Sequence, residues 1–403
     1  MNKLYALIFG LGLISQVSEA QFDCSGGRYY QDVFPTFTLT SDVTYGEAIN
    51  VNGNLQSLEL DIYQPEGDTL SQRPLLILAH GGSFVFGSKT GLDVVSLCSK
   101  FVKLGYVVVS IEYRLGFGGL PSVSSATQAV YRGTSDMKAA IRFFRKSAGE
   151  GNPYKINPDY IFTGGVSAGA FTALHAAYID EESEIPAEID PVAFGGVEGN
   201  SGNPGFSSNT RAVVNLCGAI GDTSWINVGD VPNISMHGTN DPTVPYATDL
   251  ITVLGFDLLT VDGSASIAQR MNNLGIPHEF ISWQGADHVP FVSDANYQDS
   301  VYQFVVPFLG DLLGCDPTST SAVEQTAKFE LFPNPAKDVL YFQCNELLSE
   351  ILLIDIAGRT MKQEKSPTAK SGSVDLSDMP AGIYLFQTIT LSGERIVRKV
   401  IVE

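Results

Sequence analysis

The feature that most constrains the fold of this chain is a serine between two glycines, Gly-Val-Ser-Ala-Gly at residues 165–169. An apolar run that ends at Thr163 precedes it, and an alanine-rich stretch with helical character, residues 170–177, follows it. Glycines at these positions let a strand turn sharply into a helix, because larger side chains would collide with the neighbouring backbone. The turn would lift the hydroxyl of Ser167 towards helix N-terminal amides, which favour developing negative charge. The pattern predicts a strand, a nucleophile and a helix in succession.

A second glycine turn lies upstream. Residues 74–79, Pro-Leu-Leu-Ile-Leu-Ala, read as a buried strand and run into His-Gly-Gly-Ser at residues 80–83. Backbone amides in such a turn can bind an oxyanion together with the amide that follows the nucleophile. The predicted donors are the amides of Gly82, Ser83 and Ala168. The alternative is a tight exit from a strand with no chemical role.

Downstream, the strand-like residues 231–237 lead into Gly-Thr-Asn-Asp-Pro, which places Asp241 at the end of a strand. We select Asp241 as the carboxylate that orients a catalytic base. Asp222 also ends a strand-like run and is the second candidate, although a turn or a helix cap is the more common role for such a residue.

The catalytic base is expected to be one of the five histidines of the chain. His80 belongs to the glycine turn, His175 lies within a helix-like stretch, and His237 and His278 lie in strand-like runs. His288 follows the run 278–283 on a short loop, which suits a mobile imidazole. In the order Ser167, Asp241, His288, the serine would attack, the histidine would carry the proton and the aspartate would hold the imidazole.

Together these motifs resemble the α/β-hydrolases of the esterase and lipase type, related to secreted carboxylesterases and carbohydrate esterases. The resemblance covers residues from about 40 to 314 and includes an apolar strand, residues 107–115, that ends in Tyr-Arg-Leu. Two details depart from the usual pattern: the loop is His-Gly-Gly-Ser, and Gly-Phe-Gly-Gly follows Tyr-Arg-Leu. The resemblance implies an oxyanion hole and a Ser-His-Asp triad.

The pattern of apolar runs also predicts the fold. Residues 55–63 alternate as an edge strand should. Central strands are expected near residues 74–80, 106–113, 159–164, 210–217, 231–237 and 278–283, and helices near residues 91–104, 125–147, 168–180 and 264–274. This alternation predicts a mostly parallel sheet with helices on both faces.

Two insertions bear on substrate binding. Residues 181–209 are expected to form a cap or lid, and residues 115–126 a loop near an acyl pocket. Phe84 and Trp225 are our candidate substrate-binding residues. Phe86 and Phe291 are further aromatic residues close in sequence to the motifs.

Residues 1–20 read as a secretory signal peptide, with one lysine, a short apolar core and small residues near its end. No other stretch is long and apolar enough for a transmembrane helix. The net charge is −20, and residues 21–325 hold most of it, with 33 acidic residues against 14 basic ones. This balance argues against nucleic acid or anionic lipid as a partner.

Export permits disulfides among the five cysteines. We expect Cys24 to pair with Cys98, which would staple the N-terminal segment to a helix. Cys217 and Cys315 are a weaker candidate pair. The cysteine spacing matches no zinc or haem site, so no metal ligands are predicted.

A polar linker, residues 315–326, separates the predicted catalytic domain, residues 21–314, from a C-terminal domain, residues 327–403. Short strand-like runs divided by turns predict a small β-sandwich there. Its Leu-Phe-Pro-Asn-Pro and Met-Pro-Ala-Gly-Ile-Tyr segments resemble the C-terminal sorting domain of the type IX secretion system. The resemblance implies the secretion machinery as a partner, and then removal of the domain or attachment to the cell surface. A carbohydrate-binding or linker sandwich is the alternative.

The sequence as a whole predicts a secreted serine hydrolase that cleaves carboxylic esters through an acyl-enzyme, without a metal or an organic cofactor. Acetyl or feruloyl groups on polysaccharides, lipids and polyesters are all candidate substrates. Two alternatives remain: a serine peptidase of the same fold, and a non-catalytic surface adhesion protein on a hydrolase fold.

Overall fold

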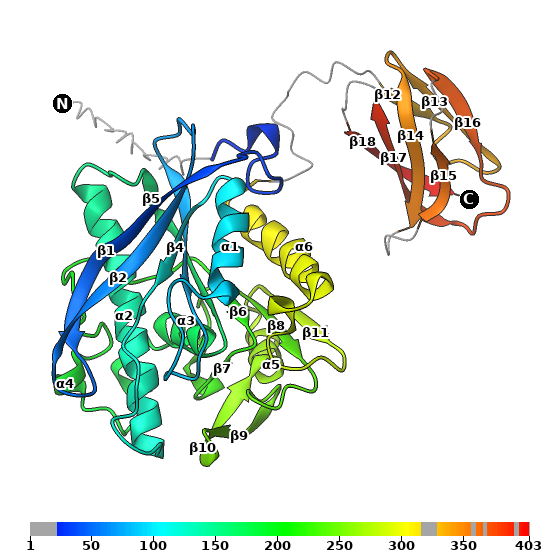
Figure 1. Ribbon diagram of the computed structural model, residues 1–403. Coiled ribbons are helices and arrows are strands. Elements are labelled where there is room, and N and C mark those ends of the chain that lie inside the picture. Colours follow the sequence, from blue (N-terminus) through cyan, green and yellow to red (C-terminus); the bar gives the residue numbers. More distant parts are fainter. Residues whose placement is uncertain (1–21, 316–328, 356–359, 366–368, 391–394, 403) are drawn as a thin grey trace, which may run out of the picture. The chain divides into compact units, whose positions relative to one another are not determined.

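The computed structural model describes residues 22–315, 329–355, 360–365, 369–390 and 395–402 (Figure 1). The predicted signal peptide and nearly all of the predicted linker lie outside these residues. Contacts between Cα atoms divide the chain into two compact units, Met1–Thr320 and Ser321–Glu403. Within the described residues, no helix combines the length and apolar composition needed to cross a bilayer.

An eight-stranded sheet forms the centre of the first unit, in the order β1-β2-β4-β3-β5-β6-β8-β11. From β4 to β11 all neighbouring strands are parallel, whereas β1 and β2 are antiparallel to their neighbours. The strands are β1 (Phe37–Ile49), β2 (Leu55–Pro65), β3 (Arg73–Ala79), β4 (Val107–Ile111), β5 (Ile156–Val166), β6 (Val213–Leu216), β8 (Asn233–Gly238) and β11 (His278–Trp283). The predicted α/β fold with a mostly parallel sheet is confirmed.

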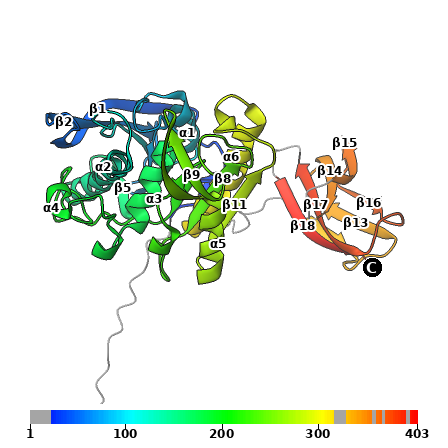
Figure 2. The ribbon, with the colours of Figure 1, turned by 90° about the horizontal axis from the view of Figure 1, so that it is seen from below.

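Helices cover both faces of this sheet, as Figure 2 shows from a second direction. The residues of β3 alternate between the faces: Leu75 and Ile77 pack with α2 and α3, while Leu76 and Leu78 pack with α1 and α6. Two apolar faces explain why the central strands read as continuous apolar runs. The main helices are α1 (Leu92–Lys103), α2 (Val123–Gly149), α3 (Ala168–Tyr178), α5 (Ser264–Leu274) and α6 (Ala295–Leu312), and α4 (Pro191–Phe194) is a single turn.

Three parts of the first unit were not expected. Strand β1 lies at the edge of the sheet, so the prediction that residues 55–63 form the edge strand is wrong. Helix α6 contributes Val301, Val305 and Leu309 to the core. A separate antiparallel sheet contains β7 (Ala219–Ile220), β9 (Thr248–Val253) and β10 (Phe256–Gly263), with a tight turn at Leu254 and Gly255 between the last two strands. We call residues 248–263 the β9–β10 hairpin.

The disulfide differs from both predicted pairs. Cys24 is bonded to Cys315, with their Cα atoms 5.6 Å apart, a separation that suits a disulfide. Cys98 is a free thiol, fully buried on the side of α1 that packs on the sheet, and Cys217 is also free and buried. The prediction failed because the N-terminal segment packs near the end of α6, where Tyr30 donates a hydrogen bond to Asp311 at 2.7 Å.

The second unit consists of two antiparallel sheets, one of three strands and one of four. Phe342 of the first sheet lies 5.9 Å from Phe386 of the second, between ring centroids, and both belong to one apolar core. This is the predicted small β-sandwich. Its strands are β12 (Phe329–Phe332), β13 (Val339–Cys344), β14 (Leu348–Asp355), β15 (Thr360–Lys365), β16 (Ser371–Asp375), β17 (Gly382–Thr390) and β18 (Arg395–Val402).

Candidate active site

Ser167 lies between the end of β5 and the start of α3, in a strained backbone conformation with φ 53° and ψ −118°. The glycines on either side make this turn sterically feasible. A Cβ at Gly165 would lie 2.3 Å from the carbonyl of Gly169, and a Cβ at Gly169 would lie 2.0 Å from the carbonyl oxygen of Ala79. A strained backbone conformation of this kind persists only where the surrounding structure holds it in place. Here the conformation points the Ser167 hydroxyl away from the sheet.

The glycine turn after β3 lies directly beside this serine. A Cβ at Gly81 would lie 3.4 Å from the Cβ of Ser167. Both Gly82 and Ser83 have positive φ, and the amides of Val85 and Phe86 donate to the carbonyl of Gly82, so the turn is tightly curled.

The three predicted oxyanion donors are free in this arrangement. In the part of the chain that the structure describes, the amides of Gly82, Ser83 and Ala168 donate to no protein acceptor. Ser83 and Ala168 also line the cavity that opens at Ser167, whereas Gly82 is not among the lining residues. The amides of Ser83 and Ala168 are therefore the better-placed pair of donors.

Tyr113 of the Tyr-Arg-Leu motif contacts this turn, and Arg114 of the same motif contacts α2. The hydroxyl of Tyr113 donates to the carbonyl of His80 at 2.8 Å, and the two rings stack with centroids 4.5 Å apart. Arg114 forms a buried ion pair with Asp136 of α2 at 2.7 Å. The sequence pattern identified these residues as a family feature, but it gave no role for them.

Ser167, His288 and Asp241 form one continuous hydrogen-bonded chain. The Oγ of Ser167 lies 2.9 Å from Nε2 of His288, and Nδ1 of the same ring lies 2.6 Å from Oδ2 of Asp241. The three residues follow β5, β11 and β8, so parallel strand ends bring them to one edge of the sheet. In this geometry Nδ1–H donates to the carboxylate and Nε2 is free to accept the proton of the serine hydroxyl.

The carboxylate of Asp241 is held on every side. Its Oδ1 accepts the amides of Thr243 and Val244, and its Oδ2 also lies 3.1 Å from Nε2 of His237. Burial by itself would raise the pKa of this carboxyl, but the hydrogen bonds from His237 and His288 outweigh that effect and lower the pKa well below its ordinary value. Asp241 is therefore ionised at any pH at which the imidazole can act as a base.

Asp222, the second candidate for the acid, has a different place. It caps the short helical turn Thr223–Trp225, and its side chain accepts the amide of Ser224 at 2.7 Å. His288, the predicted base, pairs with Asp241 instead.

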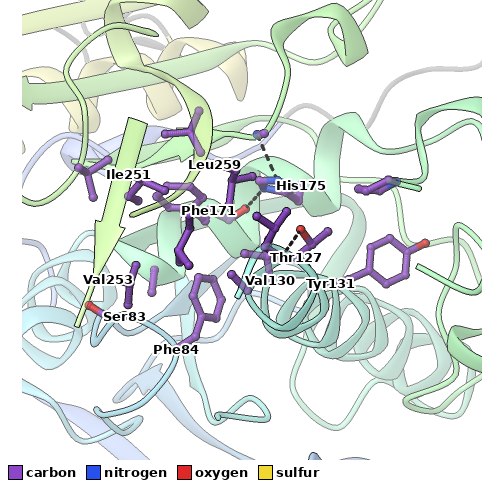
Figure 3. Close-up of a pocket in the computed structure, with 18 of the residues that line it drawn as sticks. Ser83, Phe84, Thr127, Val130, Tyr131, Phe171, His175, Ile251, Val253 and Leu259 are labelled. Carbon is purple, nitrogen blue, oxygen red and sulfur yellow. Dashed lines mark hydrogen bonds between the residues drawn. The ribbon is translucent and has the colours of Figure 1, made fainter. Parts of the chain in front are cut away.

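An apolar cavity of ≈ 300 Å³ opens at Ser167. Its walls come from α2, α3 and the β9–β10 hairpin, and Figure 3 shows Ile251, Val253 and Leu259 of the hairpin close to Phe171 and Val130. Ser167, Phe171 and His175 recur every four residues and so share one face of α3. The cavity therefore follows this helix for about 12 Å, at 1.5 Å per residue.

Both predicted substrate-binding residues, Phe84 and Trp225, line this cavity, but Phe86 and Phe291 do not. Phe86 is 63% exposed and Phe291 is buried against Trp283. The hairpin was not predicted from the sequence, although the apolar residues around the Leu-Gly turn at residues 254–255 are a usable signal for one.

His175 is the one imidazole in the described lining of this cavity. Its Nδ1 donates to the carbonyl of Phe171 at 2.7 Å, and its Nε2 accepts the amide of Gly221 at 3.3 Å. Burial lowers the pKa of His175 to about 4, so the ring is neutral at pH 7.

The predicted cap contributes only part of the cavity wall. Pro186 and Glu188 line the cavity. Farther along the same segment, Lys138 of α2 donates to the carbonyl of Val197 and Arg142 to the carbonyl of Gly202. The second half of residues 181–209 is thus packed against α2 and does not form a lid. Of the predicted loop 115–126, Phe117 lines the cavity, and so do Val123 and Ala126, which lie in the first turn of α2 and not in a loop.

Among the described residues, Cys217, Asp241 and His288 form a group whose ligand-type atoms lie within 4.8 Å of one another. Asp241 and His288 are already hydrogen-bonded to one another, and burial raises the pKa of the Cys217 thiol to about 12. A neutral thiol is a poor metal ligand. The hydrogen-bonded chain Ser167–His288–Asp241 explains this group better than a metal centre does.

Comparison with known proteins relates both units to families. Residues 60–220 match the BD-FAE family, and residues 330–403 match the secretion system C-terminal sorting domain. The chain is 32% identical over 114 residues to gut esterase 1 of Caenorhabditis briggsae and 34% identical over 113 residues to carboxylesterase 3B of Mus musculus. Each alignment covers 28% of this chain and 19% of the relative, so the chain spans about a fifth of the length of these curated relatives.

A solved structure supports the fold assignment. The truncated form of a carbohydrate esterase from gut microbiota aligns with a TM-score of 0.50 and 20% identity, over 70% of this chain and 98% of that chain. The first unit therefore has the α/β-hydrolase fold of that structure, and residues 60–220 within it match the BD-FAE family. The second unit is a C-terminal sorting domain of the type IX secretion system, which marks the chain for export, either secreted or held at the cell surface.

Proposed function

We propose that this chain is an exported serine hydrolase that cleaves carboxylic esters, and that Ser167, His288 and Asp241 carry out the reaction. The observation that carries the proposal is the unbroken hydrogen-bonded chain from Ser167 to Asp241, beside two free amides and at the mouth of an apolar cavity. The esterase names of the relatives agree with it.

The reaction proceeds in two halves. In the first, Nε2 of His288 takes the proton of the Ser167 hydroxyl while Oγ attacks the ester carbonyl. The resulting oxyanion is stabilised by the amides of Ser83 and Ala168, and each such donor contributes about 3 kcal/mol. His288 then gives the proton to the leaving alcohol. In the second half His288 activates a water molecule, which releases the acid and restores the serine.

The cavity receives the acyl part of the substrate. The leaving alcohol must lie beside Nε2 of His288, which returns the proton to it. Ser167, Ser83 and Ala168 line the cavity, whereas His288 is not among its described lining residues, so the acyl group is the part that enters. A largely apolar space about 12 Å long suits a medium-length alkyl or aromatic acyl group far better than acetate.

The exported state favours extracellular substrates, namely carbohydrate-linked acyl esters such as feruloyl groups, lipids or polyesters. The sorting domain would engage the secretion machinery before the enzyme reaches them. The proposed chemistry uses side chains and backbone amides alone and calls for no metal or organic cofactor.

The experiment is a comparison of the full chain with Ser167→Ala on p-nitrophenyl esters of increasing acyl length, methyl ferulate, acetylated xylan and a dipeptide anilide. We expect ester turnover by the wild type and a loss of about 10⁶-fold in kcat in the variant. Anilide cleavage faster than ester cleavage would favour a peptidase, and equal activity in wild type and variant would exclude the mechanism.

A further inference from the structure

A row of polar side chains lies buried beneath Asp241, and the proposed reaction uses none of them. It contains His237, Ser264, Asn215, Ser235 and Asn233, and each is at most 1% exposed. Buried polar groups are costly unless each has a hydrogen-bond partner. Because this row is connected throughout, the direction of each hydrogen bond can be derived from its two ends, the amide of Gly218 and the oxygen atoms around Nε2 of His237.

The fixed end is the amide of Gly218, which donates to Oδ1 of Asn215 at 2.9 Å. A backbone N–H is always a donor, so this side-chain atom must be the oxygen. The side-chain nitrogen of Asn215 then faces the hydroxyl oxygens of Ser235 at 2.9 Å and Ser264 at 3.0 Å. An amide NH₂ only donates, so both serine oxygens accept from it.

Ser264 is therefore left with its own hydrogen to donate. Its Oγ lies 2.8 Å from Nδ1 of His237 and 3.3 Å from the carbonyl oxygen of Gly218. The single hydroxyl hydrogen can go to only one of these two acceptors. If it goes to His237, Nδ1 accepts it and a neutral imidazole carries its own hydrogen on Nε2; the neighbours of Nε2 decide between the two arrangements.

The other side of the same ring fixes the tautomer. Nε2 of His237 lies 3.1 Å from Oδ2 of Asp241 and 3.2 Å from the carbonyl oxygen of Val244. Both neighbours are acceptors. An Nε2 without hydrogen would place a lone pair against two oxygens, so Nε2 must carry the hydrogen.

We propose that Asn215, Ser264 and His237 form a positioning relay that keeps the hydrogen of His237 on Nε2, where it is hydrogen-bonded to the carbonyl of Val244 and lies close to the catalytic carboxylate. Oδ2 of Asp241 then faces two imidazole N–H groups, that of His237 from within the fold at 3.1 Å and that of His288 from the active site at 2.6 Å. His237 shares the negative charge of Asp241 and so limits how strongly that charge favours the imidazolium form of His288. This role rests on the proposed function, because it acts through the triad.

Among the groups around Asp241, His237 is the one that can share its charge with His288. In the described residues Asp241 forms ion pairs with the two histidines alone. Tyr246 packs edge-on against the ring of His237, with centroids 5.8 Å apart, and the neutral thiol of Cys217 lies near the carboxylate. Asp287 accepts the backbone amide of His288 at 2.7 Å.

The test uses two matched variants, Ser264→Ala and Ser235→Ala. Both remove a buried hydroxyl that accepts from Asn215, but only Ser264 contacts His237. For Ser264→Ala we expect a 3- to 10-fold lower kcat, an unchanged KM and an acidic limb of kcat/KM that moves to higher pH. Ser235→Ala should keep the wild-type pH profile. Identical profiles for both variants would overturn the proposal.

A spectroscopic measurement separates this proposal from the proposed function. In the full chain labelled with ¹⁵N-histidine, the signals of His237 are assigned by their absence in His237→Gln. We expect a neutral ring with hydrogen on Nε2 in the wild type and in Ser235→Ala, and a changed signal in Ser264→Ala. Hydrogen on Nδ1 in the wild type would overturn the relay, whatever the activity measurements show about ester hydrolysis.

Discussion

Two regions of the first unit meet at Ser167, and they are built by different physical means. On one side, Ser167, His288, Asp241 and the buried polar row beneath them make hydrogen bonds whose directions follow from donor and acceptor chemistry. On the other side, the cavity that we propose for the acyl group is formed by apolar side chains of α2, α3 and the β9–β10 hairpin. Directed bonds fix atoms within tenths of an ångström, whereas packing fixes mainly volume and shape.

This difference predicts two kinds of mutational effect. A change in the polar region should lower the rate for every substrate, because the transition state always needs the same proton transfers. A change in the apolar region should alter the preference among acyl groups and leave the chemistry intact, because each acyl group fills the cavity differently.

The largest effect is expected for Asp241→Asn. All the described partners of this carboxylate are donors, from His237, His288, Thr243 and Val244. The side-chain NH₂ of an asparagine at this position would have to face one of these donors, and this would disturb the tautomer of His288. We therefore expect kcat to fall about 10⁴-fold for every ester. Steady-state kinetics on short and long acyl esters would measure it.

Asp222→Asn is the matched control, since asparagine caps a helix as well as aspartate does. It should stay within about tenfold of the wild type, measured on the same esters. A larger loss in Asp222→Asn than in Asp241→Asn would reverse the assignment of the acid.

An intermediate effect is expected in the cavity. Leu259→Trp adds volume to the hairpin wall and should lower kcat/KM for octanoate esters by 10- to 100-fold relative to acetate esters. Leu250→Trp, on the exposed face of the same hairpin, should leave the ratio unchanged. If Leu259→Trp reduced both activities equally, with the melting temperature preserved, the acyl group would have to bind elsewhere.

The smallest effect concerns His175, the polar ring within the apolar region. Burial lowers the pKa of His175 from 6.5 to about 4 in the folded chain. Between these pH values the unfolded chain binds a proton that the folded chain does not, so stability falls as the pH drops from 6.5 to 4. The loss over this window is about 3 kcal/mol.

His175→Gln should lack this part of the pH dependence. Urea unfolding at pH 7, 6 and 5 would measure it, followed by tryptophan fluorescence. The two tryptophans of the chain, Trp225 and Trp283, both lie in the first unit, so the signal reports that unit. Equal slopes for wild type and variant would show that His175 is protonated in the fold.

The sequence predicted most of the sheet and the order of the candidate triad, because both depend on local patterns. Buried parallel strands require long apolar runs, and a nucleophile turn requires glycine at Gly165 and Gly169. Asp241 and His288 stood out because each follows a strand on a short loop. In the structure they lie within hydrogen-bond distance of one another, and their catalytic role remains a prediction.

What the sequence did not reveal depends on contacts between distant segments. The disulfide partner predicted for Cys24 was wrong. Composition makes Cys98 and Cys315 equally plausible partners, and only the packing of the folded chain brings Cys315 close to Cys24. His237 was predicted to lie in a strand, which it does, but its contact with Asp241 was not predicted. That contact depends on the path of the loop after β8, which the sequence pattern does not give. The hairpin was missed because its strands form their own small sheet.

The Cys24–Cys315 bond has a consequence for the life of the protein outside the cell. It turns the 291-residue span between these cysteines into a covalent ring, which offers no loose terminus from which an exopeptidase or a pulling force could unravel it. In the chain-entropy description, closing so large a ring is worth about 6 kcal/mol. A protease that cuts beyond Cys315 would release the sorting domain and leave the ring whole.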